Sequence, residues 1–383
     1  MTNKRKIFEE LTADNRSEQT SVVSSLINQG RNKSRRAIQL WLSCLFFLVL
    51  SMILVGGLTR LNDAGLSITE WAPVVGAIPP LDIDSWQREF ERYQQIDEWR
   101  IQNQWMSLTD FKVIYWWEWG HRQLGRVIGV VWLVGLIWFW AKKQIPTGWT
   151  PRLLLLGALG GLQGLIGWWM VASGLTQGHG ILDVASYRLA IHLGLAFLIL
   201  GYLWWCILRL NRLESELLKA HQYKEPRSLL GANILMGVAF LQVLIGALVA
   251  GIDAGQSYTD WPLIGGQIFP PNAFFLDPII RNFFESPGLV QFMHRIGGYV
   301  LVIVCCIVWL MSRSSAHSQT RRLFGITLFI GTLQAGIGVL TVIHGAALPL
   351  AILHQFIAIV VWISILQARF MTTYPKPTSV RQS

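Results

Sequence analysis

Four histidines stand out because each lies inside an apolar stretch, near one end of it: His121, His192, His294 and His354. Ionisable side chains within membrane-spanning segments are costly and usually functional. A single histidine in such a stretch could serve only to hydrogen-bond two helices together. Four histidines at matching positions of a repeated sequence indicate a shared chemical role instead.

Paired imidazoles that face each other from neighbouring helices are typical of axial ligation of haem iron. Zinc normally takes three or four ligands from Cys, His and carboxylates. The chain has four cysteines, which fall in apolar runs away from these histidines: Cys44, Cys206, Cys305 and Cys306. The sequence therefore predicts two haem sites, formed by His121 with His192 and by His294 with His354.

Four arginines stand close to the histidines, at the outer boundary of the apolar stretches: Arg122, Arg126, Arg188 and Arg295. Arginine forms bidentate hydrogen bonds with carboxylates. We therefore expect these side chains to bind haem propionates. Contact with lipid headgroups is the alternative.

The surroundings of the two sites differ in one acidic residue. Glu118 lies three residues before His121 and shares its helix face if the helix begins that early, whereas Gln291 holds the matching position before His294. A carboxylate beside one site alone suggests proton handling or charge stabilisation there. The alternative is a boundary carboxylate in ordinary water.

The elements that position these residues are membrane helices. Of 383 residues, 52% are hydrophobic and only 14% are charged, whereas a soluble protein carries about a quarter charged residues. A bilayer core needs about 20 apolar residues per helix. Eight spans are expected: between Arg36 and Arg60, His121 to Ala141, between Arg152 and Asp183, between Arg188 and Arg209, between Arg227 and Asp253, Gln291 to Met311, and two between Arg322 and Arg369, divided near His344 to Pro349. The fold class is therefore an all-α membrane protein.

The distribution of charge sets the expected orientation. The net charge of +10 does not indicate nucleic-acid binding, because most Lys and Arg lie in short segments between apolar runs. A cytoplasmic amino terminus would place most of the basic residues inside, as the positive-inside rule requires. Both termini are then cytoplasmic. The first 36 residues contain four acids and resemble neither a signal peptide nor a transit peptide, which favours a bacterial inner membrane.

The chain contains an internal repeat. The segment beginning GGLTRLNDAGLSITEW at Gly56 recurs as GALVAGIDAGQSYTDW at Gly246, and the other motifs follow in the same order. Each repeat has four spans, so we expect two tandem four-helix bundles related by a pseudo-two-fold axis along the membrane normal. The expected division is a cytoplasmic tail at 1–36, a first unit at 37–210 with an outer segment at 57–120, a cytoplasmic linker at 211–228, a second unit at 229–370, and a cytoplasmic tail at 371–383.

The motifs in order resemble those of the haem A synthase family, in the branch shared by mitochondria and proteobacteria. The resemblance covers roughly residues 37 to 369. It is carried by six motifs: GGLTRL-x-x-AGLS-x-TEW-x-P, EWGHR-x-LGR, YRLA-x-HL, AG-x-x-Y-x-DWPL, QF-x-HR and LA-x-LHQ. Some members carry a Cys pair in the outer loops, which this chain lacks.

The resemblance implies an enzyme that oxidises the C8 methyl of haem O, through hydroxylated intermediates, to the formyl group of haem A for terminal oxidase biogenesis. His294 and His354 are then expected to ligate a tightly bound haem b. His121 and His192 would surround the substrate haem, with Glu118 required nearby. Our hypothesis is that Glu118 stabilises developing positive charge or moves protons at the substrate methyl, and that haem b relays electrons.

Two other functions remain open at this point. A di-haem b cytochrome passing electrons to or from quinone explains the four histidines but not the single Glu118. A transporter built from parallel repeats would use the histidines as a proton relay. The expected partners are membrane lipid, haem O, an unidentified electron-transfer partner and a haem O synthase that hands over the substrate.

The remaining features carry no assigned role. His221 and His317 lie in basic inside loops, while His179 and His344 lie near outer turns with no counterpart in the other repeat. The outer loop from Leu81 to Lys112 is polar and rich in Trp, which suggests a lid on the headgroups.

Overall fold

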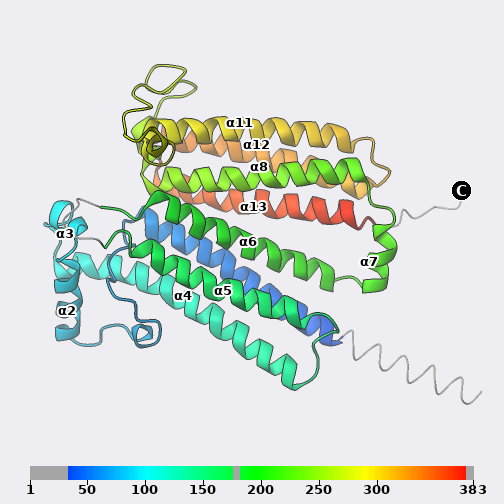
Figure 1. Ribbon diagram of the computed structural model, residues 1–383, viewed down its shortest axis with the longest axis horizontal. Helices are drawn as coiled ribbons and strands as arrows, with labels where there is room; N and C mark the ends of the chain where they lie inside the picture. The colour runs from blue at the N-terminus through cyan, green and yellow to red at the C-terminus, as the bar shows by residue number, and fades with distance from the viewer. Residues whose placement is uncertain (1–32, 176–181, 377–383) are drawn as a thin grey trace, which may run out of the picture.

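The computed structural model describes residues 33–175 and 182–376, and over these ranges the chain is helical, with no β-strand. Eight helices are long and apolar enough to span a membrane, as predicted. They are the first helix Lys33–Leu61, α4 Leu108–Ala141, α5 Thr150–Val171, α6 Ser186–Leu210, α8 Pro226–Gly251, α11 Pro287–Ser312, α12 Ser318–Ile343 and α13 Leu348–Thr373. Figure 1 shows them packed side by side as one bundle.

Local sequence signals set several of the helix starts. Four of the long helices carry proline in the first turn, where its missing N–H costs nothing: Pro151, Pro226, Pro287 and Pro349. The start of α4 is fixed by a capping box between Ser107 and Asp110.

The first helix and α4 both extend into the expected outer segment at 57–120. The first helix continues to Leu61, and α4 begins at Leu108, thirteen residues before His121. The aromatic run that precedes His121 is helical despite its charges, because the capping box starts the helix early. Glu118 therefore does share a helix with His121, as the expectation about its face required.

Shorter helices lie at the two ends of the bundle. At one end the connecting segments form η1 Val75–Ala77, α2 Ile83–Tyr93, α3 Asp97–Ile101, α9 Ala254–Ser257, η2 Ile279–Arg281 and α10 Asn282–Glu285. At the opposite end lies α7 Glu214–His221, close to the start of the first helix and the end of α13 (Figure 1). We call these the outer end and the inner end.

The core of the molecule runs through both repeats. Helix α6 of the first repeat packs against α8 and α13 of the second. One apolar cluster contains fully buried side chains from both, including Leu42, Leu200, Leu235 and Ile365. Burial of these side chains holds the two repeats together as one body.

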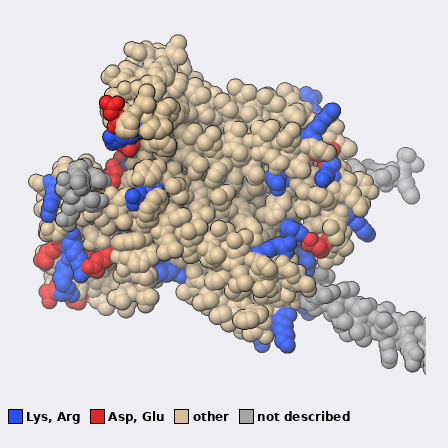
Figure 2. Space-filling model, viewed as in Figure 1, with Lys and Arg blue, Asp and Glu red and all other residues tan. Residues whose placement is uncertain are grey.

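The surface of the bundle is apolar between its ends. Figure 2 shows Lys, Arg, Asp and Glu at the two ends of the visible face and few of them between. Large apolar side chains point outward, such as Phe47 at 63% exposure and Phe329 at 69%. Soluble proteins rarely expose an apolar surface of this size to water. The protein is therefore an integral, multi-pass membrane protein.

The segment between the first helix and α4 folds as a small aromatic unit at the outer end. One face of α2 buries Trp86, Phe90 and Tyr93 against Phe111 and Tyr115 of α4. Edge-to-face and tilted ring contacts join these side chains, with centroids 4.9 to 5.8 Å apart. The expected outer loop is therefore packed onto the first turns of α4.

Candidate functional site

The four predicted histidines come from four different helices. His121 lies on α4, His192 on α6, His294 on α11 and His354 on α13, and all four are partly buried. The rings of His294 and His354 lie edge to face, with centroids 6.2 Å apart and ring planes at 75°. A metal–imidazole bond of about 2 Å on each side would separate the two centroids by about 6 Å. The centroid separation of this pair is therefore compatible with a shared metal ion.

Each imidazole lies against a glycine of a neighbouring helix. A Cβ atom placed on the glycine would come within 2.8 to 3.1 Å of the ring in every case. The four contacts are Gly56 with His121, Gly167 with His192, Gly246 with His294 and Gly338 with His354. A Cβ would force the ring to shift at Gly167 and Gly246, and would press closely on it at Gly56 and Gly338, so all four glycines allow the imidazole a close approach.

Three of the four histidines are also held by a glutamine. Gln163 Nε2 donates to the His192 backbone carbonyl at 3.0 Å, Gln242 Nε2 to that of His294 at 2.8 Å, and Gln334 Nε2 to that of His354 at 2.9 Å. The same amide nitrogens lie 3.0 to 3.2 Å from Nδ1 of the rings. The Oε1 atoms of all three glutamines are buried and have no hydrogen-bond partner among the described residues.

These glutamines were not predicted from the sequence, although a signal was present. The motif LQ-x-x-IG occurs three times, from Leu162, Leu241 and Leu333. Its Gln and Gly are four residues apart, so both face the same neighbouring helix. A polar residue repeated inside apolar spans could therefore have located the contacts with the histidines.

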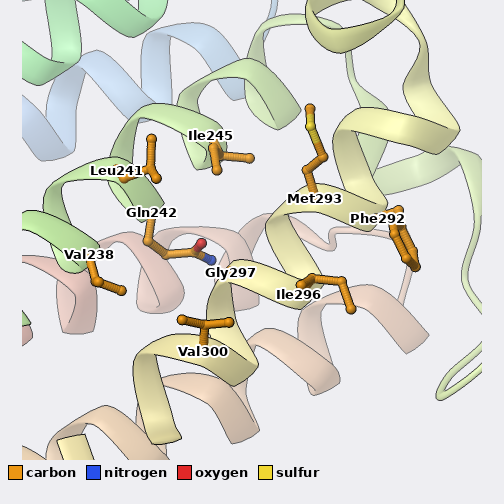
Figure 3. Close-up of a pocket in the computed structure, with 9 residues that line it drawn as sticks. All are labelled: Val238, Leu241, Gln242, Ile245, Phe292, Met293, Ile296, Gly297 and Val300. Carbon is orange, nitrogen blue, oxygen red and sulfur yellow. The ribbon is translucent and has the colours of Figure 1, made fainter. Parts of the chain in front are cut away.

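Gln242 also lines an apolar groove between α8 and α11 (Figure 3). The groove has a volume of about 310 Å³, within the range of ligand pockets. Its remaining walls are aliphatic and aromatic: Val238, Leu241, Ile245, Phe292, Met293, Ile296, Gly297 and Val300. The groove is therefore an apolar recess beside Gln242, the residue that holds His294.

Glu118 is buried and fully bonded. Its Oε2 accepts hydrogen bonds from Ser67 Oγ at 2.7 Å and from the backbone N–H of Ile68 at 2.8 Å. Its Oε1 accepts from Arg122 Nε at 3.0 Å and from a terminal guanidinium nitrogen at 2.5 Å. Four hydrogen bonds, from Ser67, Ile68 and Arg122, therefore hold this carboxylate in one orientation.

Arg122 and Arg295 make matching contacts in the two repeats. Arg122 donates to the carbonyls of Ile68 and Glu70. Arg295 donates to the carbonyls of Tyr258 and Asp260, which hold the same places in the repeated motif, and also to that of Leu263. Each guanidinium therefore ties an outer loop to the helix that carries a histidine.

The other two predicted arginines also bind backbone carbonyls. Arg126 donates to Ala72 and Pro73. Arg188 donates to Trp169 and lies over its ring at 4.4 Å. The Nε atoms of Arg188 and Arg295 are buried without an acceptor in the described part of the chain. These two side chains keep a donor for a further anionic group.

A charged cluster joins three loops at the outer end. Arg60 binds Asp63 at 2.7 Å, Asp253 at 2.7 Å and Asp183 at 3.2 Å. The three carboxylates lie within 4.8 Å of one another, with the guanidinium among them. Asp63 and Asp253 are equivalent in the repeat, and both adopt a positive φ. The cluster connects the first repeat to the second.

A second link between the repeats lies at the level of the histidines. Gln355, which follows His354 on α13, donates to the carbonyl of Ile53 in the first helix at 2.7 Å. Gly57 makes room for it, because a Cβ there would overlap the Gln355 side chain.

The histidines outside the two pairs lie apart from them. His344 is exposed at the end of α12, His221 is exposed at the end of α7, and His317 precedes α12 at the inner end. His179 lies outside the described residues.

Comparison with known proteins places this geometry in a family. Residues 39–366 match the family described as cytochrome oxidase assembly protein. A protein of Roseobacter denitrificans named heme A synthase is 58% identical over 100% of both chains. A heme A synthase of Ruegeria sp. is 55% identical over 98% of this chain and 99% of its own. One of Paracoccus denitrificans is 50% identical over 99% and 98%. The chain therefore belongs to the cytochrome oxidase assembly protein family.

Proposed function

We propose that this protein oxidises the C8 methyl group of haem O to a formyl group and so produces haem A. The observation that carries the proposal is the pair of histidine sites in one membrane bundle, only one of which has a buried carboxylate on the same helix. Relatives named heme A synthase, matched along the full chain, support the same reaction. They do not favour the electron-transfer cytochrome considered above.

The second repeat is proposed to hold a resident haem b between His294 and His354. The 6.2 Å separation of the two rings and their glutamine contacts support this assignment. The buried Nε–H of Arg295 fits a propionate of that haem. When bound, the haem would supply one-electron redox chemistry that side chains cannot. The protein's own contribution is to fix the two imidazoles and to exclude water.

The first repeat is proposed to bind haem O between His121 and His192. Arg188 retains a donor for a propionate, whereas Arg122 and Arg126 act mainly by holding the outer loop. A carbocation route for oxidising the methyl group would develop positive charge at that carbon. Glu118, held by four hydrogen bonds from Ser67, Ile68 and Arg122, is proposed to stabilise that charge or to move protons at the methyl group.

The topology expected from the sequence remains part of the proposal. Both termini are assigned to the cytoplasm because Lys and Arg prevail at the inner end, beside α7, and most acids lie at the outer end (Figure 2). Matching contacts of Arg122 and Arg295 support a pseudo-two-fold axis along the membrane normal. The units 37–210 and 229–370 would each hold one site. We further propose that a haem O synthase hands haem O to this protein. An external partner would exchange electrons with it.

Pigment analysis tests the function. In a bacterium that makes haem O but no haem A, expression of the native chain should yield haem A, detected by chromatography of extracted pigments. His294→Ala should lose haem b from the purified protein. His121→Ala should retain haem b and form no haem A. His344→Ala, outside both pairs, should match the native chain. A colourless native protein, or one with two permanent haems b and no haem A, would overturn the proposal.

A further inference from the structure

His121 differs from the other three histidines in its support. His192, His294 and His354 are each held by a glutamine from the neighbouring helix. His121 makes no side-chain hydrogen bond within the described residues. Gly56 lies against the His121 ring, as the other glycines lie against their histidines.

Methionine occupies the position of the missing glutamine. Gln242 precedes Gly246 by four residues, and Met52 precedes Gly56 by four residues. The local packing agrees with this register. A Cβ on Gly298 would meet Gln242 Nε2 at 3.6 Å, and a Cβ on Gly125, four residues after His121 as Gly298 is after His294, would meet Met52 Cε at 3.2 Å.

The two side chains have different effects on an adjacent histidine. The Gln242 amide donates to the His294 carbonyl at 2.8 Å, and the same Nε2 lies 3.0 Å from Nδ1, so one side chain contacts both the backbone and the ring of this histidine. Such a partner fixes the orientation of an imidazole that binds metal through its other nitrogen. The Met52 thioether has no donor, is a weak acceptor, and moves easily between rotamers.

We propose that Met52 makes His121 the releasable ligand, so that the first repeat lets its haem go while the second keeps it. This inference rests on the proposed function, in which the first repeat binds and releases a substrate and the second holds a resident haem. At this position of the repeat, Met52 would favour release of the haem from the first repeat, and Gln242 would favour its retention in the second. Met52 and Gln242 are therefore positioning residues that act through His121 and His294.

Reciprocal exchange of the two residues tests the idea. The native full chain, M52Q and Q242M are produced together with a haem O synthase, purified in detergent, and mixed with excess apo-globin as a haem acceptor. The haem types that remain bound are followed by extraction and chromatography. M52Q should lose haem O and haem A about tenfold more slowly than the native chain, and Q242M should lose haem b about tenfold faster.

A size-matched variant separates the amide from simple packing. Leucine, like methionine, offers no donor, so M52L should lose haem O no more slowly than the native chain. Unchanged loss of haem O from M52Q, with its haem b spectrum intact, would overturn the inference. If M52Q fails to fold, unchanged retention of haem b by Q242M overturns it equally. Failure of the proposed function is distinct, because the native chain itself would then contain no haem O or haem A.

Discussion

The two repeats share their framework and differ in the polar groups next to the histidines. Arg122 and Arg295 grip equivalent loop carbonyls, and a glycine supports every imidazole. Beside this common framework, Glu118 accepts from Ser67 and Ile68, whereas Gln291 donates to the carbonyl of Tyr258. Each side chain matches the donors or acceptors of its own loop. The two repeats share the arginine and glycine contacts and differ in the hydrogen-bonding group beside the histidine.

The largest effect is expected from making the first repeat resemble the second. In Glu118→Gln the new amide NH2 would confront a donor, either Ser67 Oγ, the Ile68 N–H or Arg122. Leaving buried donors unpaired costs about 1–3 kcal/mol each. Haem A output should fall at least tenfold while haem b is retained, as measured by pigment chromatography of membranes.

The reverse change is the matched control for Glu118. Added to Glu118→Gln, the change Gln291→Glu places a carboxylate against the Tyr258 carbonyl, so it should loosen the second outer loop and should not restore haem A formation. Normal haem A output from Glu118→Gln would remove the carboxylate from the proposed chemistry.

Replacing a glycine that lies against an imidazole should affect only the site that contains this imidazole. Gly246→Ala brings a Cβ within 2.9 Å of the His294 ring, and overpacking of this kind costs about 1–3 kcal/mol. We expect reduced haem b in the purified protein, read from its absorption spectrum. Gly160→Ala on α5, where a Cβ meets nothing within 4 Å, should leave the spectrum unchanged. Equal loss from both variants would contradict a ring-specific role.

Removal of Arg60 should weaken the connection between the repeats. Arg60→Ala leaves Asp63, Asp183 and Asp253 within 4.8 Å of one another without their cation. Repulsion among them should lower the thermal midpoint in detergent by several degrees, and acidification should reverse part of the loss. Arg60→Lys should recover part of the native midpoint. A midpoint that is unchanged at neutral pH would show that the cluster adds nothing.

The smallest effect concerns the outer segment, in which the first repeat buries a carboxyl group. Burial raises the pKa of Glu98 to about 8, with Tyr93 and Asn103 as its hydrogen-bond partners. Because the folded-state pKa lies above the unfolded one, stability is full at low pH and is lost as pH rises through about 8. The protection factors of amides in α2 and α3, which are exchange rates corrected for the intrinsic effect of pH, should fall as pH rises to about 8. Glu98→Gln should remove this fall, whereas constant protection factors in the native chain would refute it.

The sequence allowed the eight helices to be predicted because bilayer thickness imposes long charge-free runs, and it located the four histidines because a titratable group in such a run is conspicuous. The sequence left open where the helix of the span His121 to Ala141 begins, because charged and aromatic residues precede His121; it begins at Leu108, where Ser107 caps it. The partners of Glu118 could not be foreseen, since Ser67 and Ile68 lie about fifty residues away. The contacts of Arg122 and Arg295 with loop carbonyls could not be predicted either, because every residue has a backbone carbonyl and only the fold decides which ones lie near a guanidinium.

The bond from Gln355 to the Ile53 carbonyl has a mechanical consequence. Gln355 adjoins His354, and Ile53 adjoins Met52, so this contact joins the backbone beside a histidine of the second repeat to the backbone beside Met52 in the first. Sliding of the first helix along α13 would break this bond. The contact therefore couples the axial position of Met52 to that of His354.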